Sequence, residues 1–251
     1  MESKHTESIP KIIHYCWFGH EEKSKFILNC IDTWEKKLPN YLIMEWNEVN
    51  FPVDYNDYVI QAYKNKKYAF VSDVARLYAL SHYGGIYFDT DIEARNSMDP
   101  YLMEEEIIMA FESDKVVMTG FFAAKKESLF IKKWLETYDS LKFVNKDGTF
   151  DVTPNTFRVS NMLEKEGLCL NGQLQTLDNG ITVYPKEIFG AYDVDNSAYV
   201  ITSDTVVIHH CRNSWRPLNY KVKNYIKRSL AKLLGVKIYK MLRVLVKKGV
   251  V

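Results

Sequence analysis

One block, residues 72–91, constrains the fold of this chain more than any other stretch. Its first half, SDVARLYAL, has the apolar spacing of a helix that opens with Ser72 as its N-cap. A pair of glycines then ends the helix, as a left-handed C-terminal turn requires. The apolar stretch that follows, IYFDTD, has strand character and carries Asp89 and Asp91. A helix, a glycine turn and a buried strand in this order are typical of an α/β domain.

Composition supports a folded domain and excludes several other classes of protein. The chain has 251 residues, 47% of them apolar, which is enough to bury a full hydrophobic core. Its four cysteines include no C-x-x-C pair, which argues against a disulfide scaffold and a structural zinc site. No run approaches the roughly 18 apolar residues of a membrane-spanning helix, and the N-terminus lacks the apolar segment of a signal peptide. We therefore expect a cytoplasmic protein.

Apolar runs rich in β-branched and aromatic residues alternate with longer segments of helical period. This alternation predicts strands at Lys11–Phe18, Tyr41–Asn47, Gly85–Ile92, Ile107–Glu112, Val116–Ala124, Ile181–Pro185 and Thr205–His210. It predicts helices near Lys23–Lys37, Tyr55–Lys64, Val71–Tyr83, Ser128–Ser140 and Thr156–Glu166.

Basic residues are concentrated at one end of the chain. Residues 220–251 contain ten Lys or Arg and no acidic residue, which leaves residues 1–219 with a net charge of −9. We expect an α/β domain over 1–219 and a basic amphipathic helical tail over 220–251. The apolar stripe of the tail, interrupted at Gly235, suits helices on an anionic membrane surface or a helix pair packed on the domain. A nucleic-acid partner is not expected, because the acidic domain would repel a phosphate backbone.

The acidic strand end is the main candidate for chemistry. Strand period places Tyr87, Asp89 and Asp91 on one face. Two carboxylates this close in a poorly solvated place need a neutralising cation. Oxygen ligands suit Mg²⁺, Mn²⁺ or Ca²⁺, and the open positions of such an ion are commonly filled by substrate phosphates. The alternative is that both aspartates are solvated loop residues, since D-x-D alone is a weak motif.

Three other polar or aromatic groups have two interpretations each. His209 and His210 end an apolar strand, where a histidine either hydrogen-bonds a backbone carbonyl or completes an O,O,N metal site that suits Mn²⁺. Trp17 follows the first predicted strand and either stacks on a flat base or belongs to the core. Asp73 and Arg76 share a helix face, either as a surface ion pair or as part of a site.

Four stretches in this order, IHYCWFG, SDVARLYAL, YGGIYFDTD and IHHCRNSW, resemble glycosyltransferase family 32, the DXD-containing group. The resemblance spans roughly residues 9–217 and rests mainly on the continuous S-D-x-x-R…Y-G-G-I-Y-x-D-x-D block. The family includes bacterial capsule and lipopolysaccharide transferases and yeast α-mannosyltransferases, and is similar to the catalytic domain of the large clostridial glucosylating toxins. The resemblance implies a GT-A fold, a Rossmann-like α/β domain that binds a nucleotide sugar, and a retaining transfer that leaves an α-linkage.

The resemblance also implies a metal and a catalytic group. Asp89 and Asp91 would hold Mn²⁺ or Mg²⁺, with Asp91 favoured as the direct ligand, and both would act in catalysis together with Arg76. His209 would be the third metal ligand. His210 is the alternative, because a shift of one residue in strand register exchanges the two histidines.

Further residues are implied on the two substrate sides. The donor base would stack on Trp17, and the rest of the donor would contact Ser72, Asp73, Arg76, Tyr87, Asp89, Ser214 and Trp215. Here Arg212-Asn213 precede the Ser-Trp pair, where related sequences commonly have a small residue, so the contacts of that loop are open. On the acceptor side we single out Asn155.

These inferences predict a metal-dependent transferase that moves a hexose or N-acetylhexosamine from a nucleotide sugar, with UDP favoured over GDP. The acceptor would be a glycan, lipid-linked if the tail lies on the inner face of the cytoplasmic membrane. The product would be a bacterial surface polysaccharide, capsular or part of lipopolysaccharide. Two alternatives stay open: a nucleotide-sugar hydrolase, and a non-catalytic membrane-associated module with the same fold.

Overall fold

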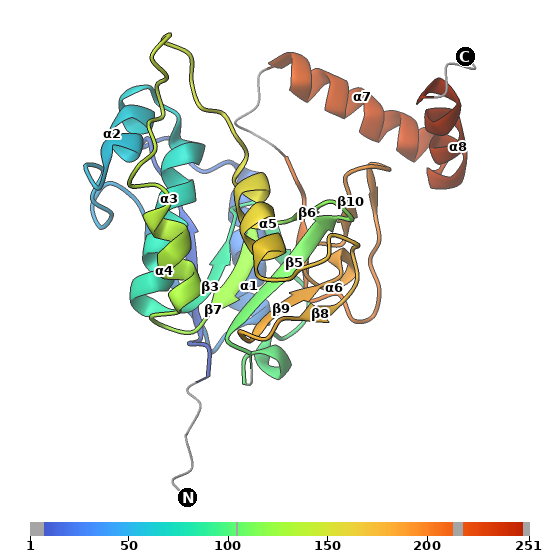
Figure 1. Ribbon diagram of the computed structural model, residues 1–251. Helices are drawn as coiled ribbons and strands as arrows, with labels where there is room; N and C mark the ends of the chain where they lie inside the picture. Colours follow the sequence, from blue (N-terminus) through green and yellow to red (C-terminus); the bar gives the residue numbers. More distant parts are fainter. Residues whose placement is uncertain (1–7, 104, 213–217, 248–251) are drawn as a thin grey trace, which may run out of the picture.

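The computed structural model describes residues 8–103, 105–212 and 218–247. A mixed sheet forms its centre, with helices on both faces (Figure 1). In sheet order the strands are β2 (Leu42–Trp46), β1 (Ile12–Cys16), β3 (Gly85–Phe88), β7 (Phe121–Ala124), β5 (Ile107–Ser113), β9 (Ile181–Tyr184) and β8 (Gln175–Thr176), with β6 (Val116–Val117) paired to β5. The α/β class expected for a GT-A fold is confirmed.

The remaining elements surround this sheet. Two short antiparallel pairs lie outside it: β4 (Ile92–Ala94) with β12 (Val207–His209), and β10 (Tyr192–Asp193) with β11 (Ala198–Tyr199). The helices are α1 (Lys25–Lys37), α2 (Asp57–Lys64), α3 (Tyr68–Tyr83), the 3₁₀ turn η1 (Asp99–Tyr101), α4 (Leu129–Glu136), α5 (Asn155–Lys165), α6 (Lys186–Phe189), α7 (Leu218–Leu234) and α8 (Val236–Lys247).

Strand directions create one edge suited to binding. β1 pairs in parallel with β2 and β3, and β5 pairs in parallel with β9. β7 lies between β3 and β5 and is antiparallel to both. The carboxyl ends of β1, β3, β5 and β9 therefore meet at one edge, and β7 begins there. Open α/β sheets bind ligands at this edge.

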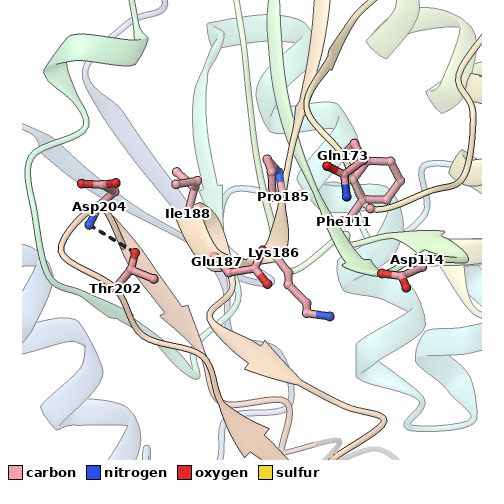
Figure 2. Close-up of a pocket in the computed structure, with 10 residues that line it drawn as sticks. Phe111, Asp114, Gln173, Pro185, Lys186, Glu187, Ile188, Thr202 and Asp204 are labelled. Atoms are coloured by element: carbon pink, nitrogen blue, oxygen red, sulfur yellow. Dashed lines mark hydrogen bonds between the residues drawn. The ribbon is translucent and has the colours of Figure 1, made fainter.

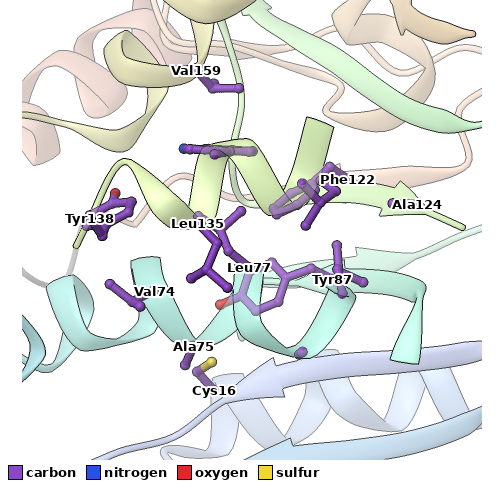
Figure 3. Packing of buried hydrophobic residues seen from close by; sticks show 14 of the residues in the cluster. Cys16, Val74, Ala75, Leu77, Tyr87, Phe122, Ala124, Leu135, Tyr138 and Val159 are labelled. Atoms are coloured by element: carbon purple, nitrogen blue, oxygen red, sulfur yellow. The ribbon is translucent and has the colours of Figure 1, made fainter. Parts of the chain in front are cut away.

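Side chains of β3 alternate between two hydrophobic cores. Ile86 and Phe88 point to the face covered by α1, where the rings of Trp34 and Phe88 lie 5.3 Å apart. Tyr87 points to the opposite face, where α3 and α4 pack, and its ring lies 5.8 Å from that of Phe122 (Figure 3). This period-two alternation places the Tyr87 hydroxyl on the α3 side of the sheet.

Helix α3 begins earlier than the sequence pattern predicts. It starts at Tyr68 rather than Val71, and Lys67 precedes it without a side-chain cap hydrogen bond. The prediction of Ser72 as an N-cap is wrong, because Ser72 lies inside the helix and its hydroxyl donates to the carbonyl of Tyr68 at 3.0 Å. Packing accounts for the difference: Phe70 and Val71 are buried, which favours one more helical turn before Ser72.

The acidic segment is a turn and not a strand. The predicted strand Gly85–Ile92 is divided into β3 and β4, with Asp89 to Asp91 between them. The amide of Ile92 donates to the carbonyl of Asp89 at 3.0 Å and closes the turn. β4 then pairs with β12 instead of the central sheet. The predicted strand Val116–Ala124 is likewise divided into β6 and β7; the other predicted elements are present with shifted ends.

The C-terminal segment is helical, as expected. α7 and α8 are separated by Gly235, whose φ of +77° suits glycine. Figure 1 shows α7 extending away from the α/β body with α8 at its far end. Within the described residues, no helix combines the length and apolar character needed to cross a membrane. The division at residue 219 stays a prediction.

A buried histidine makes the stability of the fold depend on pH. His14 Nε2 lies 2.8 Å from the carbonyl oxygen of Gly84, and the indole N–H of Trp46 donates to His14 Nδ1 at 3.0 Å. Protonating Nδ1 would place a second N–H donor against the indole N–H of Trp46, and that hydrogen bond would be lost. Burial lowers the pKa of His14 to about 4, from an ordinary 6.5, although the Gly84 carbonyl opposes this shift.

We expect the His14 contribution to the free energy of unfolding to be complete above pH 6.5 and lost as the pH falls towards 4. The loss is roughly 3 kcal/mol, because the unfolded chain takes up the proton first. Urea unfolding of wild type and His14→Gln across this range measures it, and the variant should show the flatter dependence. His82→Gln, at an exposed site, is the control. Identical slopes for wild type and His14→Gln would contradict the expectation.

Candidate metal and donor site

Three potential metal ligands converge at the carboxyl edge of β3. Each of Asp89, Asp91 and His209 offers one ligand atom, and these atoms all lie within 4.8 Å of one another. His209 Nε2 is 3.3 Å from Asp91 Oδ1 and 3.9 Å from Asp89 Oδ2. Two carboxylate oxygens and one imidazole nitrogen form a donor set that fits Mn²⁺ and also Mg²⁺. One ion can therefore contact all three side chains.

The other oxygen of each aspartate is held by the protein. Asp89 Oδ1 accepts from the Tyr87 hydroxyl at 3.0 Å and lies 3.4 Å from the Arg76 guanidinium. Asp91 Oδ2 accepts from the backbone N–H of Arg212 at 2.8 Å. Outer hydrogen bonds of this kind orient metal-binding carboxylates. They turn Asp89 Oδ2 and Asp91 Oδ1 towards His209.

The same contacts keep Asp91 ionised. Burial opposes ionisation of this carboxyl, but the positively charged His209 ring and the Arg212 backbone N–H together lower its pKa to about 2. A carboxylate at every physiological pH is what a metal ligand requires.

Arg76 is the buried cation beneath the site. Its side chain is 5% exposed, and its guanidinium lies 3.1 Å from Asp73 Oδ1 and 4.5 Å from the centre of the Tyr87 ring. It also donates to the carbonyls of Ser72 at 3.1 Å and Thr119 at 2.5 Å. These contacts hold Arg76 against Asp73 and Asp89, and its ion pair with Asp73 is buried and not at the surface. The role of Asp73 and Arg76 in donor binding stays a prediction.

The pKa of Asp73 is raised even though the carboxylate is paired with Arg76. Burial raises its pKa to about 6, the nearby Asp89 adds to the rise, and Arg76 opposes it. Asn155 supports Asp73 from behind: its amide donates to Asp73 Oδ1 at 3.4 Å, and its own oxygen accepts from Tyr138. Asn155 is 4% exposed. The acceptor role expected for Asn155 stays a prediction, because the structure shows only its buried contacts with Asp73 and Tyr138.

Gly120 is a site residue that the sequence interpretation missed as such. Its carbonyl accepts from the Asp89 backbone N–H at 2.8 Å. A Cβ at this position would lie 2.6 Å from His209 Cε1 and 2.9 Å from Asp89 Oδ2. Only glycine leaves room for the side chains of Asp89, Asp91 and His209, here called the metal group. The available signal was a glycine directly before an aromatic strand.

The two adjacent histidines point to different partners. His210 Nε2 lies 3.2 Å from Glu93 Oε2, and its Nδ1 lies 2.7 Å from the Tyr199 hydroxyl. It therefore does not join the group formed by His209. The register of β12 against β4, which pairs His209 with Ile92, fixes this choice.

Some of the residues predicted to contact the donor are described by the structure and others are not. Trp17 directly follows β1 and is partly buried; its indole N–H donates to the Glu21 carbonyl, and the Lys23 ammonium lies 5.5 Å from its ring centre. Its role in base stacking stays a prediction. Ser214 and Trp215 lie outside the described residues.

A separate cavity of about 490 Å³ lies beyond the carboxyl ends of β5 and β9 (Figure 2). Its lining combines charged, amide and apolar side chains and contains no member of the metal group. Thr202 and Asp204 come from the loop before β12, and Lys186 is paired with Asp193 at 3.6 Å. The metal group and this cavity are thus two distinct features of the molecule.

Part of the chain matches a known family model. Residues 25–108 match the family model described as "Glycosyltransferase sugar-binding region containing DXD motif". This stretch therefore resembles a DXD-type glycosyltransferase sugar-binding region. The match includes Asp73, Arg76, Asp89 and Asp91 and ends before His209, so the histidine comes to the site from outside the matched region. The predicted resemblance is confirmed over these residues.

Two relatives from Schizosaccharomyces pombe share part of the chain. Inositol phosphoceramide mannosyltransferase 3 is 32% identical over 108 residues, which is 40% of this chain and 29% of the relative. Inositol phosphoceramide mannosyltransferase 1 is 25% identical over 138 residues, which is 50% of this chain and 41% of the relative. The chain thus spans less than half the length of either relative.

Among solved structures, PaToxG Glycosyltransferase is 21% identical with a TM-score of 0.48, over 64% of this chain and 72% of that one.

We expect Mn²⁺ affinity to distinguish the two histidines. Asp91→Asn and His209→Gln should each weaken binding by more than about 100-fold, since loss of an outer-shell partner alone typically costs 10- to 100-fold. His210→Gln should bind close to wild type, because His210 faces Glu93. Isothermal titration calorimetry with MnCl₂ measures this. Loss of affinity in His210→Gln with retention in His209→Gln would contradict the assignment.

Proposed function

We propose that the protein is a metal-dependent, retaining glycosyltransferase. It would move a hexose or N-acetylhexosamine from a nucleotide sugar to a glycan acceptor and leave an α-linkage. The observation that carries this proposal is the convergence of Asp89, Asp91 and His209, two of which lie in the matched sugar-binding region. The family resemblance supports the retaining outcome.

The residues fit the electrostatic demand of such a transfer. Departure of a nucleoside diphosphate from the anomeric carbon concentrates negative charge on its terminal phosphate. A bound Mn²⁺ or Mg²⁺ would supply positive charge to that phosphate. Asp89 and Asp91 would hold the ion, each oriented through its second oxygen, while Arg76 adds a buried positive charge beneath them. Arg76 holds Asp89 in place. We also propose that Arg76 contacts the donor directly.

Retention needs no assigned nucleophile in this account. The acceptor hydroxyl would attack the face from which the diphosphate departs, and the departing phosphate would take the hydroxyl proton as the new glycosidic bond forms. A covalent sugar–enzyme adduct trapped during turnover would contradict this step.

We also propose an identity for the donor and for the acceptor. We favour a UDP-sugar and a bacterial surface polysaccharide, capsular or part of lipopolysaccharide, on the basis of the family resemblance. Both yeast relatives are named mannosyltransferases, so GDP-mannose is the first competing donor. We also propose a lipid-linked acceptor and a position on the inner face of the cytoplasmic membrane, supported by the ten basic residues in 220–251.

A donor panel tests the proposed function. Purified protein with UDP- and GDP-sugars and Mn²⁺ should release nucleoside diphosphate from one donor, and EDTA should abolish the release. Asp89→Asn and Asp91→Asn should each lower the rate by at least about 100- to 1,000-fold, the usual cost of losing one electrostatic group. Asp32→Asn, which removes a surface ion pair with Lys36, is the matched control and should keep full activity.

Three outcomes would contradict the proposal. Turnover that resists EDTA and both substitutions would remove the metal from the reaction. Sugar release that continues unchanged when acceptor glycans are supplied would indicate a nucleotide-sugar hydrolase. A gain in thermal stability with UDP and Mn²⁺ but no turnover with any donor would indicate a non-catalytic module.

A further inference from the structure

Helix α7 turns its polar side towards the protein. Arg228 and Asn224 are partly buried and Ala231 is 3% exposed, whereas most other described residues of the helix are exposed. Successive helical residues turn by about 100°, so these three share one face. The face is held by Arg228, whose guanidinium lies 4.6 Å from the centre of the Tyr192 ring.

An apolar stripe, here called the tail face, lies on the opposite side of α7. Its members are between 43% and 81% exposed: Leu218, Val222, Ile226, Leu230 and Leu233. Lys223 and Lys227 flank it on one side, and Lys221 and Lys232 flank it on the other by the same helical rotation. On α8, Ile238 and Met241 are also more than half exposed.

This orientation is the reverse of an ordinary surface helix, which buries its apolar stripe against the core. The alternative of a helix pair that packs its stripe on the domain therefore does not describe α7. Apolar side chains in a row with lysines on both sides are the pattern of helices that lie in a membrane interface.

We propose that the tail face docks on an anionic phospholipid bilayer. Residues 220–251 carry ten basic and no acidic residues, so they are attracted to such a surface, while the net charge of −9 on residues 1–219 is repelled by it. A second copy of the chain fits less well, because the stripe would bring two sets of flanking lysines together. This inference rests on the geometry of α7 and not on the transferase activity.

Vesicle flotation of the full chain tests the proposal. The protein should float with phosphatidylcholine vesicles that contain phosphatidylglycerol and should stay behind with phosphatidylcholine alone. Ile226→Asp with Leu233→Asp should lower the partition coefficient by about 100-fold, since two apolar side chains lose their burial. Val49→Asp with Leu129→Asp is the matched control, because these apolar residues are also exposed, at 92% and 75%, and lie outside α7 and α8.

Absence of flotation, or equal flotation of both double variants, would overturn the proposal. Sedimentation velocity supplies a further check. A wild-type dimer that is lost only in the Ile226→Asp, Leu233→Asp variant, without vesicle binding, would assign the face to a second copy instead.

The inner face of α7 carries a second, independent inference. Arg228 donates to the carbonyl oxygens of His210 at 2.8 Å and of Cys211 at 2.9 Å. Cys211 has a φ of +47°, a left-handed conformation that a non-glycine residue adopts only when its surroundings hold it there. The turn that Arg228 holds starts directly after His209 and leads to the Arg212 N–H, which donates to Asp91 Oδ2.

We infer that Arg228 is a positioning residue for the metal group, an inference that rests on the proposed function. A single guanidinium nitrogen, Nη2, donates to both of these consecutive carbonyls, so one side chain holds the turn. Through this contact a helix outside the family match holds the backbone that connects His209 with the Arg212 N–H, the donor to Asp91. Helix α7 would then support the metal group in addition to binding the membrane.

Mn²⁺ calorimetry on variants with matched charge tests this inference. Arg228→Met should bind Mn²⁺ about tenfold more weakly than wild type, in the range of outer-shell losses. Arg228→Lys should recover part of that loss, since its ammonium keeps the positive charge and can donate to these carbonyls. Arg243→Met removes the α8 arginine that pairs with Asp195 and should bind as wild type does. Circular dichroism melting confirms that each variant is folded at the titration temperature.

The outcomes separate the inference from the proposed function. Equal affinities in Arg228→Met, Arg243→Met and wild type would overturn the positioning role alone. Failure of wild-type protein to bind Mn²⁺, with or without UDP, would overturn the proposed function and this inference together.

Discussion

The site depends on offsetting the repulsion between carboxylates gathered at one sheet edge. Asp89 and Asp91 lie there together, and the buried guanidinium of Arg76 contacts both Asp89 and Asp73. Burial of Asp73 raises its pKa to about 6, and the Arg76 guanidinium opposes that rise. A divalent cation between Asp89, Asp91 and His209 would offset the repulsion between the two aspartates. Asp89 and Asp91 are each held through one oxygen, which leaves the other oxygen of each free to contact an ion.

Topology brings the parts of this group together from distant segments. β3 delivers the acidic turn to the edge, and antiparallel β7 begins beside it, which places Gly120 against Asp89. The short ladder between β4 and β12 supplies His209, and a slip of one residue there would present His210 instead. The catalytic proposal therefore rests on a backbone arrangement, in which two small strand pairings and one glycine decide which side chains meet.

Features encoded locally were predictable from the sequence, and features set by packing were not. The helix and the glycine turn of residues 72–85 follow each other in the chain, so their type was correctly predicted. The cap at Ser72 was wrong because buried residues upstream extend the helix, and the acidic strand proved to be a turn because β4 finds its partner in β12. Asn155 was placed on the acceptor side, yet only its burial beside Tyr138 and Asp73 defines its contacts. Arg228 acts across 17 residues of chain, which no local pattern reveals.

Anomalous diffraction at the manganese edge, from crystals grown with UDP and MnCl₂, is the most direct test of the central claim. The account predicts one strong anomalous peak in contact with oxygens of Asp89 and Asp91, with His209 on its remaining protein side and the UDP diphosphate bound to the same ion. A structure with UDP bound but no anomalous peak at these side chains would contradict it.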